Sequence, residues 1–160
     1  MTTIITKLTQ EDFINVNFVL WFKKRSIKIL IGIYHFFLLS SLISLASSTT
    51  GVFQVVFPLL FMTAVPVLIY FSAKRNYGSN KRVSEAIEYK FDKDALIVTG
   101  ESLNSQLSWD KIYKVTQTRN WLLIWQNAQV ANVIPKRDVW QSHLDDLKDI
   151  LNTYNVKHNL

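Results

Sequence analysis

The amino-acid sequence predicts an α+β membrane protein in which a two-helix transmembrane hairpin carries a small antiparallel β domain. Two apolar segments occupy residues 27–46 and 52–73, and Lys28 is the only charged residue within them. From residue 85 onward the pattern changes to short alternating segments separated by turn residues, as is typical of antiparallel strands. A last segment with apolar residues at helical spacing predicts a helix that caps the β domain.

Composition limits the class of protein. Of the 160 residues, 49% are hydrophobic and only 19% are charged, whereas average globular proteins have about 25% charged residues. The chain contains no cysteine, which excludes a disulfide framework and thiolate metal sites.

The net charge of +6 is concentrated beside the two apolar segments. Eight of the 18 basic residues flank these segments, and no acidic residue occurs between Asp12 and Glu85. The other 10 basic residues are opposed by 12 acidic ones, a balance of −2 that argues against nucleic-acid binding. The flanking residues are Lys23, Lys24, Arg25, Lys28, Lys74, Arg75, Lys81 and Arg82.

Both apolar segments are long enough to cross a bilayer. A helix of about 20 residues rises about 30 Å, the thickness of the hydrocarbon core. Pro58 and Pro66 in the second segment are tolerated in membrane helices, where neighbouring groups satisfy the freed carbonyls. The alternative is that the two segments are buried core helices of a soluble protein. Two apolar segments of this length in a chain of 160 residues disfavour that alternative.

The basic flanks predict the orientation of the hairpin. The loop at residues 47–51 is polar and uncharged, while both outer flanks are strongly basic. The positive-inside rule therefore places both termini in the cytoplasm and the loop outside. A cleaved signal peptide fits poorly, because the first apolar run begins too far into the chain and a second one follows.

Residues 1–26 are expected to form a strand and an interfacial helix. Thr9 and Asp12 have the spacing of a capping box. The apolar run at residues 13–22 that follows is too short to span a membrane, which favours a helix at the interface. Residues 3–8 have the composition of a strand and can join the sheet of the β domain.

Residues 83–152 are expected to form a cytoplasmic antiparallel sandwich or partly open barrel with a C-terminal helix, and residues 153–160 a tail. The sequence predicts Asp138 as the N-cap of the helix and one apolar face. That face carries Trp140, Leu144, Leu147 and Leu151. The expected strands are 87–91, 95–99, 105–109, 113–118, 121–125 and 129–134.

Two short motifs in this domain carry a family resemblance. Residues 109–115 read WDKIYKV, and residues 134–137 read IPKR. With two spans before them and a helix after them, they resemble the YcxB-like family of bacterial membrane proteins, from about Leu8 to Leu151. The resemblance implies a pleckstrin-homology-like β domain behind a membrane hairpin, and it implies no activity.

No motif for catalysis or cofactor binding is present in the sequence, so we expect no enzyme and no cofactor. Glycine-rich phosphate loops, G-x-S-x-G and H-E-x-x-H are all missing. His35 lies in the first span, and neither span has an acidic residue to pair with it. We expect His35 to pack against the second span, with a hydrogen bond to Gln54 or Thr63, rather than to relay protons.

A metal site on the final helix is also disfavoured. His143, Asp145, Asp146 and Asp149 suggest ligands, but metal binding needs three or four that converge. A solvated acidic helix face explains the same residues. The turn at residues 92–94 offers one lysine between two aspartates, which argues against a phosphoinositide site there.

The strand at residues 121–125 holds the first candidates for partner binding. Trp121, Leu123 and Trp125 share one face, and Leu122 and Ile124 share the other. Either the fold covers both faces, with the tryptophan face at the centre of the barrel, or one face binds a partner through tryptophan anchors. We favour the first reading.

The sequence as a whole favours a membrane-tethered, non-enzymatic interaction module. Lys136 and Arg137 are further candidates for binding an acidic partner or anionic lipid, with a solvated turn as the alternative. The expected partners are the lipid bilayer and an unidentified protein, with self-association open and no nucleic acid. Two other classes are an immunity protein that binds a membrane-targeting toxin and a subunit of an oligomeric transporter or membrane enzyme.

Overall fold

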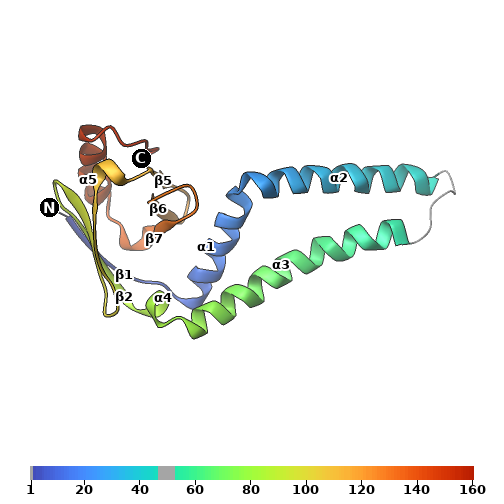
Figure 1. Cartoon of the computed structure of the whole chain (residues 1–160), viewed down its shortest axis with the longest axis horizontal. Helices are drawn as coiled ribbons and strands as arrows, with labels where there is room; N and C mark the ends of the chain where they lie inside the picture. The colour runs from blue at the N-terminus through green and yellow to red at the C-terminus, as the bar shows by residue number, and fades with distance from the viewer. Residues whose placement is uncertain (1, 47–52) are drawn as a thin grey trace. The chain divides into compact units, whose positions relative to one another are not determined.

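The computed structural model describes residues 2–46 and 53–160 and divides into two units (Figure 1). The β unit comprises the chain up to Asp12 and from Asn80 onward, and the helical unit comprises Phe13–Ser79. The loop that the sequence places outside the membrane, at residues 47–51, lies outside the described residues.

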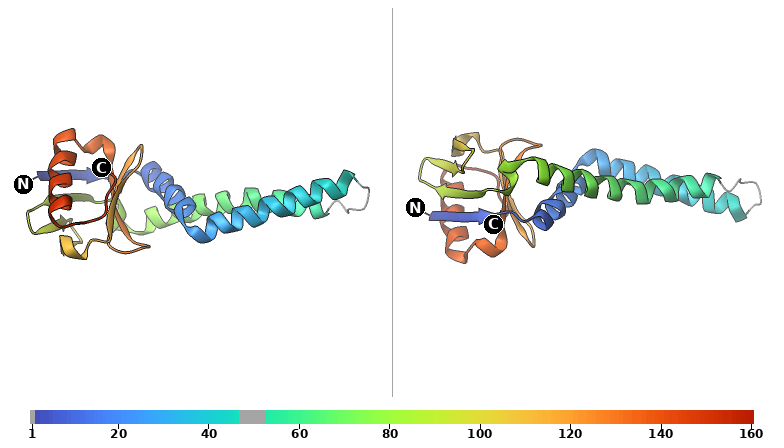
Figure 2. Two further views of the ribbon diagram at one scale, coloured as in Figure 1. Left: turned by 90° about the horizontal axis from the view of Figure 1, so that it is seen from above. Right: turned by 90° about the horizontal axis from the view of Figure 1, so that it is seen from below.

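The helical unit contains two long apolar helices. They are α2 (Arg25–Ala46) and α3 (Phe53–Ser79), preceded by most of α1 (Gln10–Lys23). α2 and α3 lie side by side in all three ribbon views (Figures 1 and 2). α3 includes Pro58 and Pro66 and continues through the basic residues Lys74 and Arg75.

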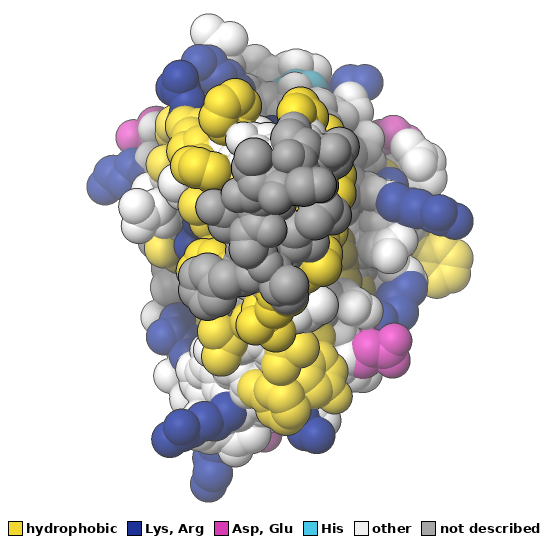
Figure 3. Space-filling view, turned by 90° about the vertical axis from the view of Figure 1, so that its right-hand side faces the viewer, with side chains coloured by type: hydrophobic (Ala, Val, Ile, Leu, Met, Phe, Trp, Pro, Cys, Tyr) yellow, Lys and Arg dark blue, Asp and Glu magenta, His cyan; other side chains and the backbone are white. Residues whose placement is uncertain are grey.

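The apolar side chains of these helices are largely exposed. Windows within α2 and α3 pass the length and hydropathy criteria for crossing a membrane, and only 0% and 6% of their residues are buried. A core helix of a soluble protein passes the same criteria, but it is mostly buried. Figure 3 shows hydrophobic side chains on the surface that faces the viewer.

Local contacts at the start of α1 confirm the predicted capping box. The Thr9 amide donates to Asp12 Oδ2 at 2.9 Å, and the Asp12 amide donates to Thr9 Oγ1 at 3.1 Å. Each side chain therefore satisfies an amide that the first helical turn leaves without a partner.

The β unit consists of two antiparallel sheets in the described part of the chain, and neither closes into a barrel. One sheet has the strand order β1-β2-β3-β4, and the other has the order β5-β6-β7. The strands are β1 (Thr2–Lys7), β2 (Ala86–Phe91), β3 (Ala95–Thr99), β4 (Asn104–Ser108), β5 (Lys114–Gln117), β6 (Trp121–Trp125) and β7 (Ala131–Pro135). The helical pieces are α4 (Lys81–Ser84), the 3-10 turns η1 (Trp109–Lys111) and η2 (Lys136–Asp138), and α5 (Gln141–Thr153).

The N-terminal segment joins the first sheet, as its composition predicts. β1 pairs antiparallel with β2, and Ile4 lies opposite Tyr89. Ile4 is buried, while Ile5 on the other face is exposed. This alternation is what a strand with one face on a core requires.

One core joins both sheets, α5 and the C-terminal segment. Trp109 is its largest fully buried residue. The indole Nε1 of Trp109 donates to the carbonyl of Asp92 at 2.9 Å, and its ring lies 6.2 Å from that of Phe91. Leu147 and Leu151 cover this core from α5, as the helical spacing predicts.

The start of α5 differs from the prediction. Trp140 is the N-cap, with an extended backbone (φ −78°, ψ 158°), so its side chain precedes the helical face and is 74% exposed. The prediction that Trp140 packs in the core was therefore wrong. Asp138 is not the N-cap either: it lies in η2, and its Oδ2 accepts a hydrogen bond from Thr6 Oγ1 in β1 at 2.5 Å.

Candidate interaction site

All five residues of β6 are buried, but only one face of the strand belongs to the core of the β unit. Leu122 and Ile124 belong to the core, whereas Trp121, Leu123 and Trp125 lie outside that cluster of residues. The alternation is as predicted, but the placement of the tryptophan face at the centre of the domain was wrong. The large aromatic side chains in the core instead include Trp109 of η1 and Phe91 of β2. The aliphatic face of β6, with Leu122 and Ile124, belongs to the same core.

Trp125 is held by side chains of the neighbouring strand β5. Its Nε1 donates to Thr116 Oγ1 at 2.9 Å, and Lys114 Nζ lies 5.2 Å from the ring centroid, within cation–π range. Trp121 is held at the other end of β6, where its amide donates to Thr118 Oγ1 at 3.1 Å. A role for either tryptophan in anchoring a partner stays a prediction.

Arg137 is engaged by a carboxylate from the distant N-terminal segment. Its Nη1 and Nη2 donate to Asp12 Oδ1 and Oδ2 at 2.8 and 2.5 Å, a bidentate pair. These bonds, opposed by partial burial, lower the pKa of Asp12 from 3.8 to about 2, and they raise the pKa of Arg137. Arg137 therefore fastens the start of α1 to η2.

The two basic residues predicted as binding candidates, Lys136 and Arg137, have different partners in the structure. Lys136 Nζ donates to Gln117 Oε1 at 3.0 Å, toward β5, whereas Arg137 reaches the N-terminal segment. Lys136 keeps only a neutral partner among the described residues, and it lines a polar cavity described below.

The carboxylates of α5 have separate partners. Asp145 accepts a hydrogen bond from Gln141 at 3.0 Å, and Asp146 accepts one from Thr2 Oγ1 in β1. His143 Nδ1 accepts a hydrogen bond from the Trp140 amide at 3.3 Å. Within the described ranges, no cluster of three or more His, Cys, Asp or Glu side chains has a metal-binding arrangement.

His35 in α2 bonds within its own helix, not across the hairpin. Its Nδ1 lies 2.7 Å from the carbonyl oxygen of Ile31, and Thr63 Oγ1 donates to the carbonyls of Leu59 and Leu60. The predicted hydrogen bond from His35 to Thr63 was therefore wrong, because the helical backbone offers both side chains a closer acceptor. The side chain of the other predicted partner, Gln54, lies outside the described residues.

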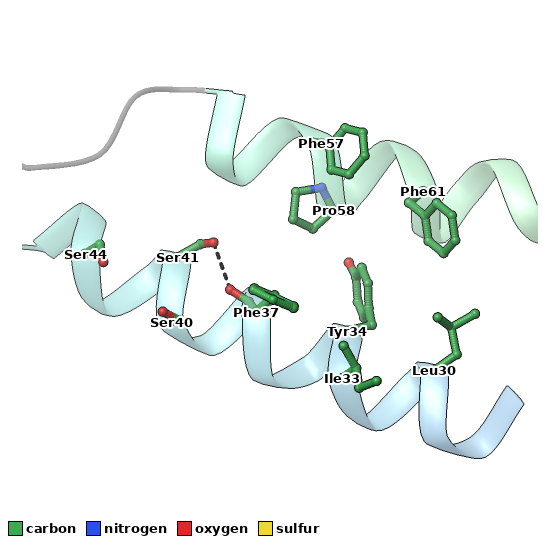
Figure 4. A pocket seen from close by; sticks show the side chains of 10 residues that line it. All are labelled: Leu30, Ile33, Tyr34, Phe37, Ser40, Ser41, Ser44, Phe57, Pro58 and Phe61. Atoms are coloured by element: carbon green, nitrogen blue, oxygen red, sulfur yellow. Dashed lines mark hydrogen bonds between the residues drawn. The ribbon is translucent and has the colours of Figure 1, made fainter. Parts of the chain in front are cut away.

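A cavity of about 700 Å³ lies between α2 and α3 (Figure 4). Figure 4 shows the hydroxyl of Tyr34 pointing toward α3, and this buried hydroxyl has no hydrogen-bond partner among the described residues. The Ser41 hydroxyl instead donates to the carbonyl of Phe37 in its own helix. The other lining residues are Leu30, Ile33, Ser40, Ser44, Phe57, Pro58 and Phe61.

Sequence reasoning missed a groove between β5 and α5, which we call the tail groove. After α5 the chain reverses at Asn155, whose φ of 56° is in the left-handed region that asparagine adopts more readily than most residues. Residues 156–160 then run beside β5, with a parallel bridge between Val115 and His158. The only local signals are the turn-forming Asn155 and the apolar Val156 and Leu160 in an otherwise polar tail.

A cavity of about 280 Å³ opens in the tail groove. It presents two lysine side chains, Lys136 and Lys148, and one carboxylate, Asp145. The remaining lining residues are Gln117, Gln141, Leu144 and Leu160. This combination of a sheet edge, basic side chains and an apolar residue favours binding of a peptide segment over catalysis.

These features define a small α+β protein with two membrane-length apolar helices and a β unit of two antiparallel sheets. The family model described as YcxB-like protein matches residues 91–150, which include both motifs that carry the resemblance. The predicted family resemblance is thereby confirmed for the segment from the end of β2 to α5. No curated protein and no solved structure matches the chain.

Proposed function

We propose that this protein is a membrane-anchored, non-enzymatic interaction module on the cytoplasmic face of the bacterial inner membrane. The observation that carries the proposal is the exposure of apolar side chains along α2 and α3. A helix in water hides such side chains, whereas lipid solvates them. Anchoring raises the effective concentration of the β unit toward partners at the membrane.

The basic residues support the proposed orientation. Lys23, Lys24 and Arg25 lie at the junction of α1 and α2, and the second group follows the apolar part of α3 and continues into α4. Both groups are at the ends of the helices away from residues 47–52, and under the positive-inside rule this supports a cytoplasmic position for these ends. Two antiparallel sheets followed by a helix agree with the pleckstrin-homology-like domain that the resemblance implies.

Labelling of single cysteines tests both the anchor and its orientation. The chain has no native cysteine, so Ser48→Cys and Lys157→Cys each introduce one reactive thiol. A membrane-impermeant reagent added to intact cells should label the first variant and not the second, while both are labelled after lysis. Labelling of Lys157→Cys in intact cells would show that the orientation is the opposite of the proposed one. Recovery of the chain in the cytosolic fraction would show that the chain is not anchored in the membrane.

Co-purification from mild detergent, followed by mass spectrometry, tests the interaction role. We expect cytoplasmic or membrane-associated proteins that are retained by the full chain and lost when the β unit is removed. Capture of a secreted toxin by the hairpin alone would favour the immunity alternative. A stoichiometric complex of membrane-spanning subunits would favour the transporter or enzyme alternative.

A further inference from the structure

We infer that the tail groove is a docking site for an extended acidic peptide, and that the tail, residues 157–160, is its displaceable internal occupant. The inference rests on the proposed function, because it names the kind of partner that the β unit would bind. It is argued from the pairing, the charge and the apolar contacts of this groove.

The first observation is the position of β5 at the edge of its sheet. The strand order β5-β6-β7 leaves one side of β5 without a neighbouring strand of the sheet. Such an edge presents backbone donors and acceptors to which an extended peptide can add. The tail already uses this edge, since the Val115 amide donates to the carbonyl of Lys157 at 2.8 Å.

The second observation is that the tail pairs only partly with β5. Val115 makes the one backbone–backbone hydrogen bond between the described residues of β5 and the tail. At Gln117 the amide is met by the side-chain Oδ1 of Asn159 at 2.7 Å, where a regular strand would offer a carbonyl. The bridge is parallel, and parallel pairing is slightly less stable per residue than antiparallel pairing. A partner strand that pairs along all of β5 would make more backbone bonds than the tail does.

The third observation is the mismatch of charge among the side chains. The cavity presents Lys136 and Lys148, and Asp145, the one acidic side chain in its lining, accepts a hydrogen bond from Gln141. Residues 157–160 contain no acidic side chain that could complement these lysines. The ion pairs of Arg137 lie elsewhere, with Asp12 and Asp138, and no ion pair holds the described residues of the tail. Carboxylates on an incoming segment would complement the two lysines, which makes an acidic peptide the favoured occupant.

The fourth observation separates the fixed part of the tail from the displaceable part. Val156 is buried in the core, and its amide donates to the carbonyl of Leu151 at 2.9 Å. Leu160 packs against the core from outside and lines the cavity. A volume of about 280 Å³ is below the range of about 300–1,000 Å³ typical of small-molecule pockets, and it suits side chains of a peptide. The recognised segment would therefore place an apolar residue where Leu160 lies, with acidic residues before it.

Peptide binding to the full chain in detergent micelles tests the inference. The probe is a fluorescent tetrapeptide, Glu-Glu-Asn-Leu, which copies residues 157–160 with glutamate in place of Lys157 and His158. Fluorescence anisotropy would compare the complete chain with a variant that ends at Val156. We expect the shortened chain to bind the probe about tenfold more tightly, since the competing tail is gone. It should also prefer the probe to the native-sequence peptide Lys-His-Asn-Leu.

Two further variants identify the contacts. Lys136→Glu combined with Lys148→Glu in the shortened chain should abolish or reverse the preference for the acidic peptide. Asn159→Ala in the complete chain removes the side-chain bonds to Gln117 and should give an intermediate affinity. Asn104→Ala, an exposed asparagine in β4, is the matched control and should bind as the wild type does.

The results separate this inference from the proposed function. A shortened chain that keeps its circular dichroism but binds the probe no better than the complete chain would show that the tail only covers the edge. A shortened chain that unfolds would show that the tail is part of the fold, which also overturns displacement. Membrane fractionation reports on the anchor independently, so a cytosolic chain that still binds the probe would overturn the proposed function alone.

Discussion

The β unit and the helical unit place the same type of residue in opposite surroundings. Leu122 and Leu147 in the β unit are fully buried, whereas Leu39 and Leu68 in the helical unit are 60% and 66% exposed. Burying a leucine in a protein interior is worth about 1.5–3 kcal/mol in water. Leu122 and Leu147 obtain this stabilisation from the core of the β unit, whereas the described residues leave Leu39 and Leu68 largely without it. In the proposed function the bilayer provides it instead.

The largest expected effect is the loss of the central tryptophan of the β unit. Trp109→Ala would leave a cavity beside Phe91 and remove the donor to the carbonyl of Asp92, at a cost of about 3–5 kcal/mol. Urea unfolding followed by circular dichroism would measure the loss. Trp140→Ala removes the same side chain from an exposed site and should change the unfolding free energy by less than about 0.5 kcal/mol. Equal losses for both variants would mean that the two tryptophans are misassigned.

A charged residue on α2 tests the helical side of the comparison. Leu39→Arg places a cation at an exposed position near the middle of α2, and in a membrane this costs about 2.5–3.5 kcal/mol of insertion free energy. We expect less chain in the membrane fraction, while the unfolding of the β unit is unchanged. Leu39→Ile is the control with similar volume and no charge. Wild-type membrane content in Leu39→Arg would contradict exposure of this face to lipid.

The sequence predicts elements well where local periodicity decides the structure. The strand at residues 121–125 has the predicted bounds, and the N-terminal segment joins the sheet as its composition suggests. The error at Trp140 has a local cause, because its spacing to Leu144 is meaningful only if the backbone is already helical there. The helix begins one residue later, after the 3-10 turn of η2.

Long-range contacts were beyond prediction from a single sequence. Asp12 and Arg137 are 125 positions apart, and no periodicity relates them. The same holds for Gln117 and Asn159, whose hydrogen bonds place the tail in its groove. Arg137, which the sequence presents as a candidate for partner binding, is therefore engaged within the fold. The tail, which no sequence motif marks, occupies a strand edge that can bind a partner.

Acid should weaken the link between the N-terminal segment and η2. The pKa of Asp12 is about 2 in the folded protein and 3.8 for an ordinary aspartate, so this stabilisation is present above about pH 4 and is lost as the pH falls toward 2. We expect it to be about 1–2 kcal/mol, less than the full shift implies, because the Arg137 side chain is 51% exposed and its charge is screened.

Asp12→Asn measures this contribution directly. The difference in unfolding free energy between wild type and Asp12→Asn should be largest near pH 6 and should shrink near pH 2.5. Asp149→Asn, on the exposed face of α5, is the matched control and should follow the wild type at both pH values. A difference that does not change with pH would show that the pair acts through packing and not through charge.

The smallest expected effects are on the outer face of α5, where solvent already surrounds the carboxylates. Asp149→Ala should leave both stability and partner capture unchanged, because its side chain is exposed. Asp146→Ala removes the acceptor for the Thr2 hydroxyl of β1, so it should cost about 0.5–1.5 kcal/mol without affecting capture. His143→Ala should likewise retain capture, since it loses only a contact within the first turn of α5. Asp145→Ala should retain or strengthen capture, because it removes the acidic side chain that lines the tail groove. If two of these four variants remained folded and lost capture or cellular function, α5 would carry a metal or acid–base site, and the β unit would be more than a binding domain.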